Sequence, residues 1–281
     1  MAQLTGLLGY PVHHSVSPQM QNAAFNEQGL SFEYEKFNVP PEQLQQAVEA
    51  LKTFHYKGCN VTIPHKTAVM PFLDEISEEA RRIGAVNTIV NENGVLVGYN
   101  TDGAGFVKGV ERLMNRRISS QDTILVIGAG GASRAICYAL ANKNPKVVAI
   151  ANRTEAKATQ IANDCLRESD VVLSLQQAEE QLASFGIVIN TTSMGMNEDD
   201  PLPLSLTHLN EGTYVIDIIY NPFQTKWLTL AKEKGAIIDN GVAMLVFQGA
   251  LAFTKWTGKE PNVSLMEQIV VKSVGGNYVI R

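Results

Sequence analysis

The sequence predicts an α/β protein with two domains, and three features of the chain support that fold class. Over the first third of the chain, short runs that suit strands alternate with stretches that suit helices. An apolar run at 123–127 then leads through a glycine-rich turn into a helical stretch, as in a doubly wound sheet of the Rossmann type. Two apolar helical stretches, at 242–256 and 264–274, follow the last expected strand.

The last two helices are expected to return to the first domain, which makes that domain discontinuous. We therefore predict a first α/β domain with a mixed sheet at 1–104, completed by 243–281, and a Rossmann-type doubly wound domain at 105–242. A cleft between the two domains would be the place for a small-molecule ligand.

The composition argues against two classes of partner. The 281 residues are 45% hydrophobic and 18% charged, and the net charge is −5. A nucleic-acid surface needs a basic field, so we expect no nucleic-acid partner. No apolar run reaches the roughly 18–20 residues of a membrane-spanning helix, and we expect no membrane association.

Cysteine and histidine usage suggests a cytoplasmic protein without a metal site. Cys59, Cys137 and Cys165 are odd in number, widely spaced and free of a CxxC pair, which suits buried, free thiols in a reducing compartment. No two of the five histidines have the i, i+4 spacing that places two imidazoles on one helix face.

The elements of the first domain follow from periodicity, proline and turn residues. We predict strands at 4–9, 32–39, 58–63, 84–90 and 95–99, the last two joined by a turn at 91–94. Helices are expected at 18–27, 40–54, 66–73, 77–83 and 103–114.

A pair of serines precedes the first helix. Pro18 suits the first helical turn, which places Ser17 at the N-cap and Ser15 two residues earlier. Hydroxyls, backbone N–H groups and the positive end of the helix dipole can together hold a small carboxylate. A capping role alone would also explain Ser17, although it accounts less well for two serines.

The stretch from Asn60 to Lys66 brings an amide, a hydroxyl and a primary amine together within seven residues. Pro64 fixes the backbone between Thr62 and Lys66. From spacing alone, a solvated lysine at the start of a helix explains Lys66 as well as a lysine in a site does.

The glycine-rich turn matches the context of a dinucleotide fingerprint. The strand at 123–127 is followed by Gly128, Ala129, Gly130, Gly131, Ala132 and Ser133, and a helix continues through 135–140. Ser133 replaces the third glycine of G-x-G-x-x-G. The alternative is an ordinary turn between a strand and a helix.

The tip of the next strand, at 146–150, is expected to face the adenosine ribose. An acidic residue there would bind the 2′-hydroxyl of NAD, but the tip carries Asn152, Arg153 and Thr154, with Lys157 following. An arginine fork suits a 2′-phosphate, so we predict NADP over NAD. The alternative is that Arg153 is only a surface charge.

Three further strands, at 186–190, 213–220 and 236–239, complete the second domain. Their following loops at 190–196 and 218–222 are expected to contact the cofactor, because ligands bind at the C-terminal ends of such strands. In the helix at 242–256, Gln248 either points into a site or satisfies a backbone group. Ser264 and Glu267 predict a capping box at the start of the last helix.

Together these motifs resemble the shikimate dehydrogenase family, and the resemblance covers essentially the whole chain. Ser15-Val-Ser17-Pro18 resembles the family's carboxylate-binding segment, and residues 60–66 resemble the segment that carries its catalytic lysine. Gly84-Ala-Val-Asn87-Thr and Asn100-Thr-Asp102-Gly resemble the segments with a substrate-binding asparagine and the aspartate partner of that lysine.

The second half of the chain matches further motifs of the same family. Residues 128–132 and 152–157 resemble its NADP loop and its 2′-phosphate site. Residues 217–222 and 241–248 resemble the late segments that supply a tyrosine and a glutamine to the substrate. Two places depart from the pattern: Gln21 stands where a histidine is usual, and Lys226-Trp227 where Pro-Leu is common.

The resemblance implies reversible reduction of 3-dehydroshikimate to shikimate by NADPH, in chorismate and aromatic amino-acid biosynthesis. It implies Lys66 and Asp102 as catalytic residues, with Asp102 orienting the lysine. The implied substrate-binding residues are Ser15, Ser17, Thr62, Asn87, Asp102, Tyr220 and Gln248. The implied cofactor-binding residues are Gly128, Ala129, Gly130, Gly131, Ala132, Asn152, Arg153, Thr154 and Lys157, with Glu78, Ile218 and Gly241 near the nicotinamide.

Two other functions fit parts of the pattern. One is a quinate/shikimate dehydrogenase with a broader substrate range or NAD use. The other is a protein that senses NADP(H) without catalysis, which would be expected to lack one member of the Lys66–Asp102 pair. A monomer or a homodimer is expected in either case.

Overall fold

The structure, a computed structural model, describes residues 2–276 and separates into two compact units. Within the described residues, unit 1 comprises 2–105 and 246–273, and unit 2 comprises 106–245 and 274–276. The predicted first domain also included residue 1 and residues 277–281, which lie outside the described residues.

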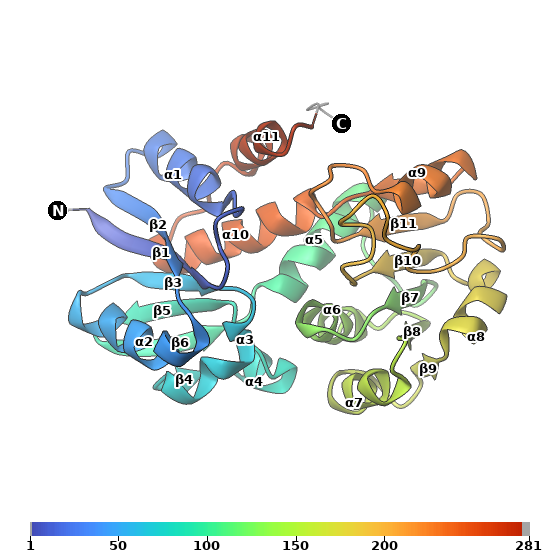
Figure 1. The fold of residues 1–281 in the computed structure, drawn as a ribbon, viewed down its shortest axis with the longest axis horizontal. Coiled ribbons are helices and arrows are strands. Elements are labelled where there is room, and N and C mark those ends of the chain that lie inside the picture. Colours follow the sequence, from blue (N-terminus) through green and yellow to red (C-terminus); the bar gives the residue numbers. More distant parts are fainter. Residues whose placement is uncertain (1, 277–281) are drawn as a thin grey trace. The chain divides into compact units, whose positions relative to one another are not determined.

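Unit 1 is built on a six-stranded mixed sheet with the strand order β2-β1-β3-β5-β6-β4 (Figure 1). Its strands are β1 (Gln3–Gly9), β2 (Phe32–Asn38), β3 (Gly58–Val61), β4 (Glu75–Ile76), β5 (Thr88–Glu92) and β6 (Val95–Tyr99). β5 runs antiparallel to both of its neighbours, β3 and β6, and the remaining pairs are parallel. The predicted mixed sheet is confirmed.

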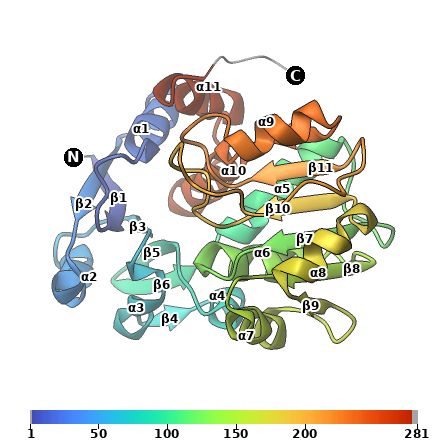
Figure 2. The same cartoon turned by 45° about the vertical axis from the view of Figure 1, so that its right-hand side comes forward.

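The helices of unit 1 come from both ends of the chain. They are α1 (Ser17–Glu27), α2 (Leu44–Thr53), α3 (His65–Ala68), α4 (Glu78–Ile83) and α11 (Val263–Ser273), with 3-10 turns η1 (Pro41–Gln43) and η2 (Met70–Phe72). α11 packs along α1, as both views show (Figures 1 and 2). The later part of α10 (Val242–Thr257) is anchored to β5, because the Trp256 indole donates a hydrogen bond of 3.0 Å to the Ile89 carbonyl.

Two expected helices of unit 1 differ from the structure at their N-terminal ends. α1 begins at Ser17 with Val16 as its cap residue, so Ser17 is not the N-cap. α11 begins at Val263, and Asn262 accepts a hydrogen bond from the Leu265 N–H at 3.1 Å, so the predicted Ser264 capping box is wrong. α1 therefore starts one residue earlier, and α11 two residues earlier, than a serine at the N-cap position indicated.

Two further boundaries in unit 1 are set by proline and glycine. The helix expected at 66–73 stops at Ala68, and the 3-10 turn η2 follows with Pro71 at its centre, where an α-helical N–H is missing. The strand expected from residue 84 starts only at Thr88, because Gly84 ends α4 in the left-handed region with φ 73°.

Unit 2 is a parallel six-stranded sheet with the order β12-β11-β10-β7-β8-β9. Its elements are β7 (Thr123–Ile127), α6 (Gly131–Ala141), β8 (Val147–Ala151), α7 (Glu155–Cys165), β9 (Val171–Leu173), α8 (Leu175–Glu180), η3 (Leu182–Ser184), β10 (Ile187–Asn190), β11 (Tyr214–Asp217), α9 (Lys226–Glu233) and β12 (Ile237–Asp239). Read from β9, this is the 3-2-1-4-5-6 strand order of the Rossmann fold. The predicted doubly wound domain is confirmed.

Both faces of this sheet are buried. Along β7, Ile124 and Val126 pack with α5 (Asp102–Met114), α6 and α7, while Leu125 and Ile127 pack with α8 and α9 on the opposite face (Figure 2). The strands are therefore continuous apolar runs, as expected of a sheet covered on both sides. Their ends are in register, since Ile127 pairs with both Ala151 and Asn190, and Asn190 with Asp217. The loops that follow these strands consequently share one edge.

Candidate active site

A lysine and an aspartate form a largely buried ion pair in unit 1. Lys66 lies in α3 and Asp102 is the first residue of α5, and the Lys66 Nζ stands 2.6 Å from the Asp102 Oδ2. Their side chains are 21% and 6% exposed. The lysine is thus neither the solvated surface residue that spacing alone allowed nor sealed from small molecules.

The segment around Lys66 is fixed by its neighbours. His65 is buried, and its Nε2 lies 2.6 Å from the Val39 carbonyl oxygen. The Lys66 carbonyl accepts a hydrogen bond of 2.8 Å from the Val86 N–H. These contacts tie α3 to the end of β2 on one side and to the chain before β5 on the other, so the lysine has a fixed origin.

Asn87 holds the second oxygen of Asp102. Its Nδ2 donates to the Asp102 Oδ1 at 2.8 Å and also lies within hydrogen-bond distance of Thr101 Oγ1, at 2.9 Å, and of Gln248 Oε1, at 3.3 Å. Asn100 accepts from the Asp102 backbone N–H at 3.0 Å. Asp102 is therefore held at both carboxylate oxygens and at its backbone, and Gln248 joins the same group of side chains.

Asn60 and Tyr34 brace Asn87 from behind. The Asn60 Nδ2 donates to the Asn87 carbonyl and to Thr88 Oγ1, each at 3.1 Å, and the Tyr34 hydroxyl donates to Asn60 Oδ1 at 2.9 Å. Burial raises the pKa of Tyr34 well above its usual value, so the phenol keeps its proton for this bond. The Asn60 amide therefore holds the start of β5.

The serine pair and Thr62 lie in the same unit. The Ser15 Oγ accepts a hydrogen bond from the Ser17 N–H at 3.2 Å and lies 3.2 Å from the Ser17 Oγ. Burial has the larger effect on the pKa of Tyr34 and raises it, whereas a hydrogen bond with Ser17 lowers it. The Thr62 backbone N–H is bonded to the Leu8 carbonyl. Within residues 2–276, the Thr62 hydroxyl makes no hydrogen bond to protein, which leaves it available to a ligand.

A cavity of about 290 Å³ lies at the C-terminal edge of the sheet in unit 2. It is lined by Gly128, Ala129, Gly130, Asn152, Arg153, Thr154, Lys157, Thr191, Thr192 and Ser193. Most of the predicted cofactor residues therefore meet in one place. The lining has two cations and no carboxylate, which suits a polyanionic ligand.

The glycine-rich turn has the shape expected of a phosphate-binding loop. Gly128 has φ 111°, and the buried Ser133 donates to the Gly128 carbonyl at 2.7 Å, which closes the turn. A Cβ atom at Gly130 or Gly131 would meet no protein atom within 4 Å. Since α6 has no side-chain cap, its first N–H groups are open to an anion. Ala132 lies in the first turn of that helix.

The predicted 2′-phosphate residues surround the start of α7. Arg153, Thr154 and Lys157 are exposed, and Thr154 is the cap residue of α7 without a side-chain cap bond. Asn152 donates to the Thr154 carbonyl at 2.9 Å, which folds the strand tip over. A guanidinium, an ammonium and an open helix N-terminus thus face the same solvent-accessible region of the cavity.

Four predicted residues lie outside both the polar cluster around Lys66 and Asp102 and the cavity of unit 2. Ile218 and Gly241 touch each other in unit 2, where a Cβ atom at Gly241 would collide with the Ile218 carbonyl. Tyr220 is half-buried and burial raises its pKa. Glu78 is 80% exposed at the start of α4 in unit 1, paired with Arg82 at 3.0 Å.

The structure adds residues that the sequence did not indicate. Tyr34, Thr88 and Thr101 belong to the hydrogen-bonded group around Asn87, and Asp217 is fully buried at the end of β11. Thr88 and Asp217 could have been noticed in the sequence, because each is a polar residue within or directly after an apolar run. No comparable signal marks Tyr34, because its partner Asn60 lies 26 residues away.

The cysteine side chains of the described chain form no disulfide bond. All three cysteines are free and buried, and burial raises the pKa of Cys137 to about 12 and of Cys165 to about 11. Among residues 2–276, no group of three or more His, Cys, Asp or Glu side chains is arranged to hold a metal ion. The helices that the structure describes include none with the length and apolarity to cross a membrane.

Family comparisons match most of the chain in three segments. Residues 7–89 match the family described as "Shikimate dehydrogenase substrate binding domain". Residues 112–198 match "Shikimate / quinate 5-dehydrogenase", and residues 241–271 match "Shikimate 5'-dehydrogenase C-terminal domain".

Individual relatives agree with these matches over nearly the full length. A curated relative, the shikimate dehydrogenase (NADP(+)) of Geobacillus sp. (strain WCH70), is 51% identical over 278 residues, covering 98% of this chain and 100% of the relative. The shikimate 5-dehydrogenase of Thermus thermophilus, solved in complex with NADP(H) and shikimate, has a TM-score of 0.87 at 36% identity, with 97% of this chain and 100% of that chain covered. The quinate dehydrogenase of Corynebacterium glutamicum, solved in complex with NAD, has a TM-score of 0.88 at 30% identity, with 96% and 99% covered.

Proposed function

The chain belongs to the shikimate dehydrogenase family, and we propose that it catalyses the reversible NADPH-dependent reduction of 3-dehydroshikimate to shikimate in chorismate and aromatic amino-acid biosynthesis. The observation that carries the mechanism is the Lys66–Asp102 pair, held at 2.6 Å and extended by Asn87 to Gln248. It offers one mobile proton beside several fixed hydrogen-bonding groups, as reduction of a ketone on a hydroxylated ring requires.

Lys66 acts as the proton donor in this mechanism. Bound NADPH would supply the hydride for the carbonyl carbon, and Lys66 supplies the proton for the carbonyl oxygen, on which negative charge develops. An ammonium has three donors and the bond to Asp102 uses one, which leaves two for the substrate. In the direction of oxidation, the amine of Lys66 takes the proton of the substrate hydroxyl, and bound NADP⁺ would accept the hydride.

The remaining polar groups orient the substrate. Ser15 and Ser17, at the N-terminal end of α1, bind its carboxylate, supported by the adjacent helix dipole. Thr62, Asn87, Asp102 and Gln248 bind the ring hydroxyls, and Tyr220 from unit 2 adds a further contact.

NADP is held by unit 2. The turn from Gly128 to Ala132 and the first N–H groups of α6 would hold the pyrophosphate, and Asn152, Arg153, Thr154 and Lys157 would hold the 2′-phosphate. Ile218 and Gly241 carry the nicotinamide end, together with Glu78. Support for NADP over NAD comes from the two cations and the lack of a carboxylate in the cavity lining.

The absorbance of NADPH tests this function directly. Shikimate and quinate are each offered with NADP⁺ and with NAD⁺, and the fastest production of reduced cofactor is expected for shikimate with NADP⁺. No reduction of either cofactor with either acid would contradict the proposal and favour a protein that binds NADP(H) without catalysis.

Quinate is the one substrate alternative with specific support. The match to "Shikimate / quinate 5-dehydrogenase" and the similarity to a quinate dehydrogenase bound to NAD both favour a test of it. A higher kcat/KM with quinate, or with NAD⁺, would assign the chain to that broader activity.

We place the protein in the cytoplasm as a monomer or a homodimer. Support for a reducing compartment comes from the three free, buried cysteines. Light scattering coupled to gel filtration distinguishes the two assembly states.

A further inference from the structure

Asp217 is a buried carboxylate in unit 2 that the mechanism above does not use. It is the last residue of β11 and its exposed fraction is 0%. Its Oδ1 accepts hydrogen bonds from Asn190 Nδ2 and from the Ile219 N–H, each at 3.1 Å, and its Oδ2 accepts from Thr225 Oγ1 at 3.0 Å. No cation is paired with it among residues 2–276, so three hydrogen bonds alone offset the cost of burying the charge.

Each of the three donors belongs to a different segment. Asn190 ends β10, and its Oδ1 accepts from the Thr192 N–H and hydroxyl at 3.0 and 2.7 Å, which shapes the loop at 190–196. The Ile219 N–H belongs to the loop at 218–222. Thr225 is the N-cap of α9 and accepts from the Leu228 N–H at 3.3 Å. One carboxylate therefore joins two loops and a helix end.

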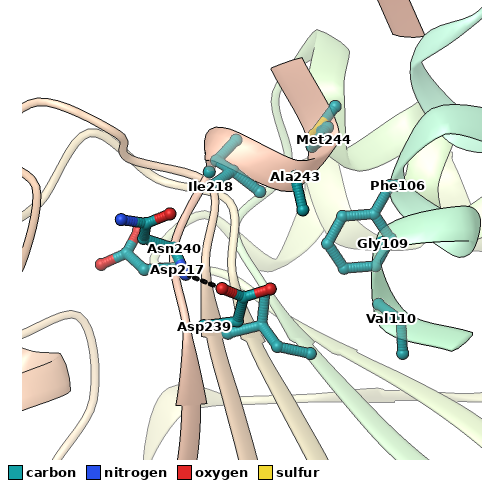
Figure 3. Close-up of a pocket in the computed structure, with 11 residues that line it drawn as sticks. Phe106, Gly109, Val110, Asp217, Ile218, Asp239, Asn240, Ala243 and Met244 are labelled. Atoms are coloured by element: carbon teal, nitrogen blue, oxygen red, sulfur yellow. Dashed lines mark hydrogen bonds between the residues drawn. The ribbon is translucent and has the colours of Figure 1, made fainter. Parts of the chain in front are cut away.

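The loop held by Asp217 sets the place of Gly241. The Gly241 N–H donates to the Ile219 carbonyl at 3.0 Å, and the Gly241 backbone approaches the Ile218 carbonyl so closely that a Cβ atom would not fit. Figure 3 shows Asp217, Ile218 and Asn240 clustered at the ends of β11 and β12, with Phe106 and Val110 of α5 on the other side of a small cavity. That cavity measures about 10 Å³, room for about one water molecule, so it is not itself a ligand site.

We propose that Asp217 is a positioning residue that holds Ile218 and Gly241 in the arrangement that orients the nicotinamide ring for hydride transfer. The inference rests on the proposed function, which places those two residues at the nicotinamide end. Asp217 itself, being fully buried, does not touch the cofactor and acts through the backbone of residues 218 and 219.

The ionised form of Asp217 is the one that matches its surroundings, because it accepts three bonds and donates none. Burial raises the pKa of Asp217 to about 6, and hydrogen bonds from Ile219, Asn190 and Thr225 limit that rise. The other titratable groups on its own strand and on the elements packed around it are Tyr214 of β11, Tyr220 of the following loop, Asp239 of β12, and Lys226, Lys232 and Glu233 of α9. β10 and the loop at 190–196 contribute none. Asp217 therefore takes up a proton as pH falls through about 6.

Protonation has opposite effects on function and on stability. A carboxyl whose folded pKa is raised binds its proton more tightly in the folded state, so its contribution to stability increases as pH falls through about 6. Over the same pH range, the protonated carboxyl group can accept fewer hydrogen bonds from the two loops than the carboxylate does. Acid thus weakens the positioning of Ile218 and Gly241 without weakening the fold through this group.

The test is Asp217→Asn in the full-length protein. At about pH 8, kcat/KM for NADP⁺ at saturating shikimate is expected to fall by about 10–100-fold, since a misplaced reacting group costs that much. KM for shikimate and the melting temperature should be nearly unchanged. The wild type should lose kcat/KM for NADP⁺ as pH falls through about 6, and the variant should lack that acid limb.

Asp170→Asn is the matched control. The Asp170 side chain is also fully buried in unit 2, but it pairs with Arg167 at 2.7 Å and accepts from the Val148 N–H at the opposite, N-terminal end of β8. Burial acts to raise its pKa, and the hydrogen bonds from Arg167 and Val148 outweigh burial and lower it. This variant should melt at a lower temperature while keeping the wild-type pH profile and nucleotide dependence.

Two results would overturn the inference. One is an Asp217→Asn variant with wild-type kcat/KM for NADP⁺ and an intact acid limb. The other is a lower melting temperature together with higher KM values for both shikimate and NADP⁺, which marks a merely structural residue.

The fluorescence of bound NADPH gives a test without turnover, because it reports the surroundings of the nicotinamide. The spectra should differ between the wild type and Asp217→Asn, and equal spectra count against the inference. If the wild type binds NADPH but oxidises no shikimate, the proposed function fails, and this comparison still decides the role of Asp217.

Discussion

Two lysine–aspartate pairs of equal length differ in what surrounds them. Lys52–Asp74 and Lys66–Asp102 both measure 2.6 Å, but the first pair is 39% exposed at each side chain while Lys66 and Asp102 are 21% and 6% exposed. An exposed pair contributes about 0–1 kcal/mol, and a buried pair must first offset the cost of desolvation. The elaborate hydrogen bonding of Asp102 is therefore better explained by chemistry at Lys66 than by stability.

At the residue scale, we propose that Arg153 sets the preference for NADP over NAD. Replacing it by glutamine removes the guanidinium that is proposed to bind the 2′-phosphate, and a hydrogen bond to a charged group contributes about 1.5–3 kcal/mol. We expect kcat/KM for NADP⁺ to fall by about 10–100-fold and that for NAD⁺ to change little. Steady-state rates with both nucleotides measure the ratio.

Arg117→Gln provides the control for the same substitution. Arg117 is exposed in unit 2 and lies outside the cavity lining. Arg117→Gln should leave the ratio of kcat/KM for NADP⁺ to kcat/KM for NAD⁺ at the wild-type value. An unchanged NADP⁺/NAD⁺ ratio in Arg153→Gln would place the 2′-phosphate elsewhere.

At the residue scale, the sequence predicts side chains better than it predicts their contacts. Lys66, Asn87 and Asp102 stand in recognisable motifs, and the structure brings them together. The bond between Tyr34 and Asn60 could not be foreseen, because it depends on which strands become neighbours. Asp217 was passed over because its apolar neighbours suggested only a strand.

At the scale of elements, long apolar runs were predictable and short elements were not. β7 has the expected bounds, Thr123–Ile127, since an uninterrupted apolar run fixes both of its ends. β9, with only Val171–Leu173, exists because its backbone pairs with β8, and three residues show no periodicity. Helix starts were misplaced where a serine suggested the cap position, because α1 begins one residue earlier and α11 two residues earlier than those serines indicated.

The start of α11 gives a test at this scale. Asn262→Ala removes the side-chain oxygen that accepts from the Leu265 N–H, so the free energy of unfolding should fall by about 1 kcal/mol. Ser264→Ala removes only a hydroxyl inside the first turn and should change it by no more than a few tenths of a kcal/mol. Urea unfolding of the two variants compares them. A larger effect at Ser264 would restore the capping box that the sequence suggested.

At the scale of the whole molecule, the alternation of strands and helices predicts two α/β sheets but not their strand orders. In unit 2, the chain builds β7, β8 and β9 outward and then returns to place β10 beside β7. The loops that follow β7 and β10 therefore lead to opposite faces of the sheet, and the 290 Å³ cavity lies at the sheet edge where they separate. In unit 1, the hairpin β5–β6 makes β5 antiparallel to β3, which brings Asn87 next to the start of α5.

We propose that unit 1 supplies the proton and that unit 2 binds the nucleotide, and Lys66→Ala tests this division most directly. Lys66 belongs to unit 1 and the cavity proposed for NADP belongs to unit 2, so the substitution should abolish proton transfer without disturbing nucleotide binding. We expect kcat for shikimate oxidation to fall by about 10²–10⁴-fold, with the Kd for NADP⁺ and the KM for shikimate nearly unchanged. Lys52→Ala, which breaks the exposed pair of equal length, should retain wild-type turnover. Turnover by Lys66→Ala within about twofold of the wild type would contradict the assignment of Lys66 as the proton donor.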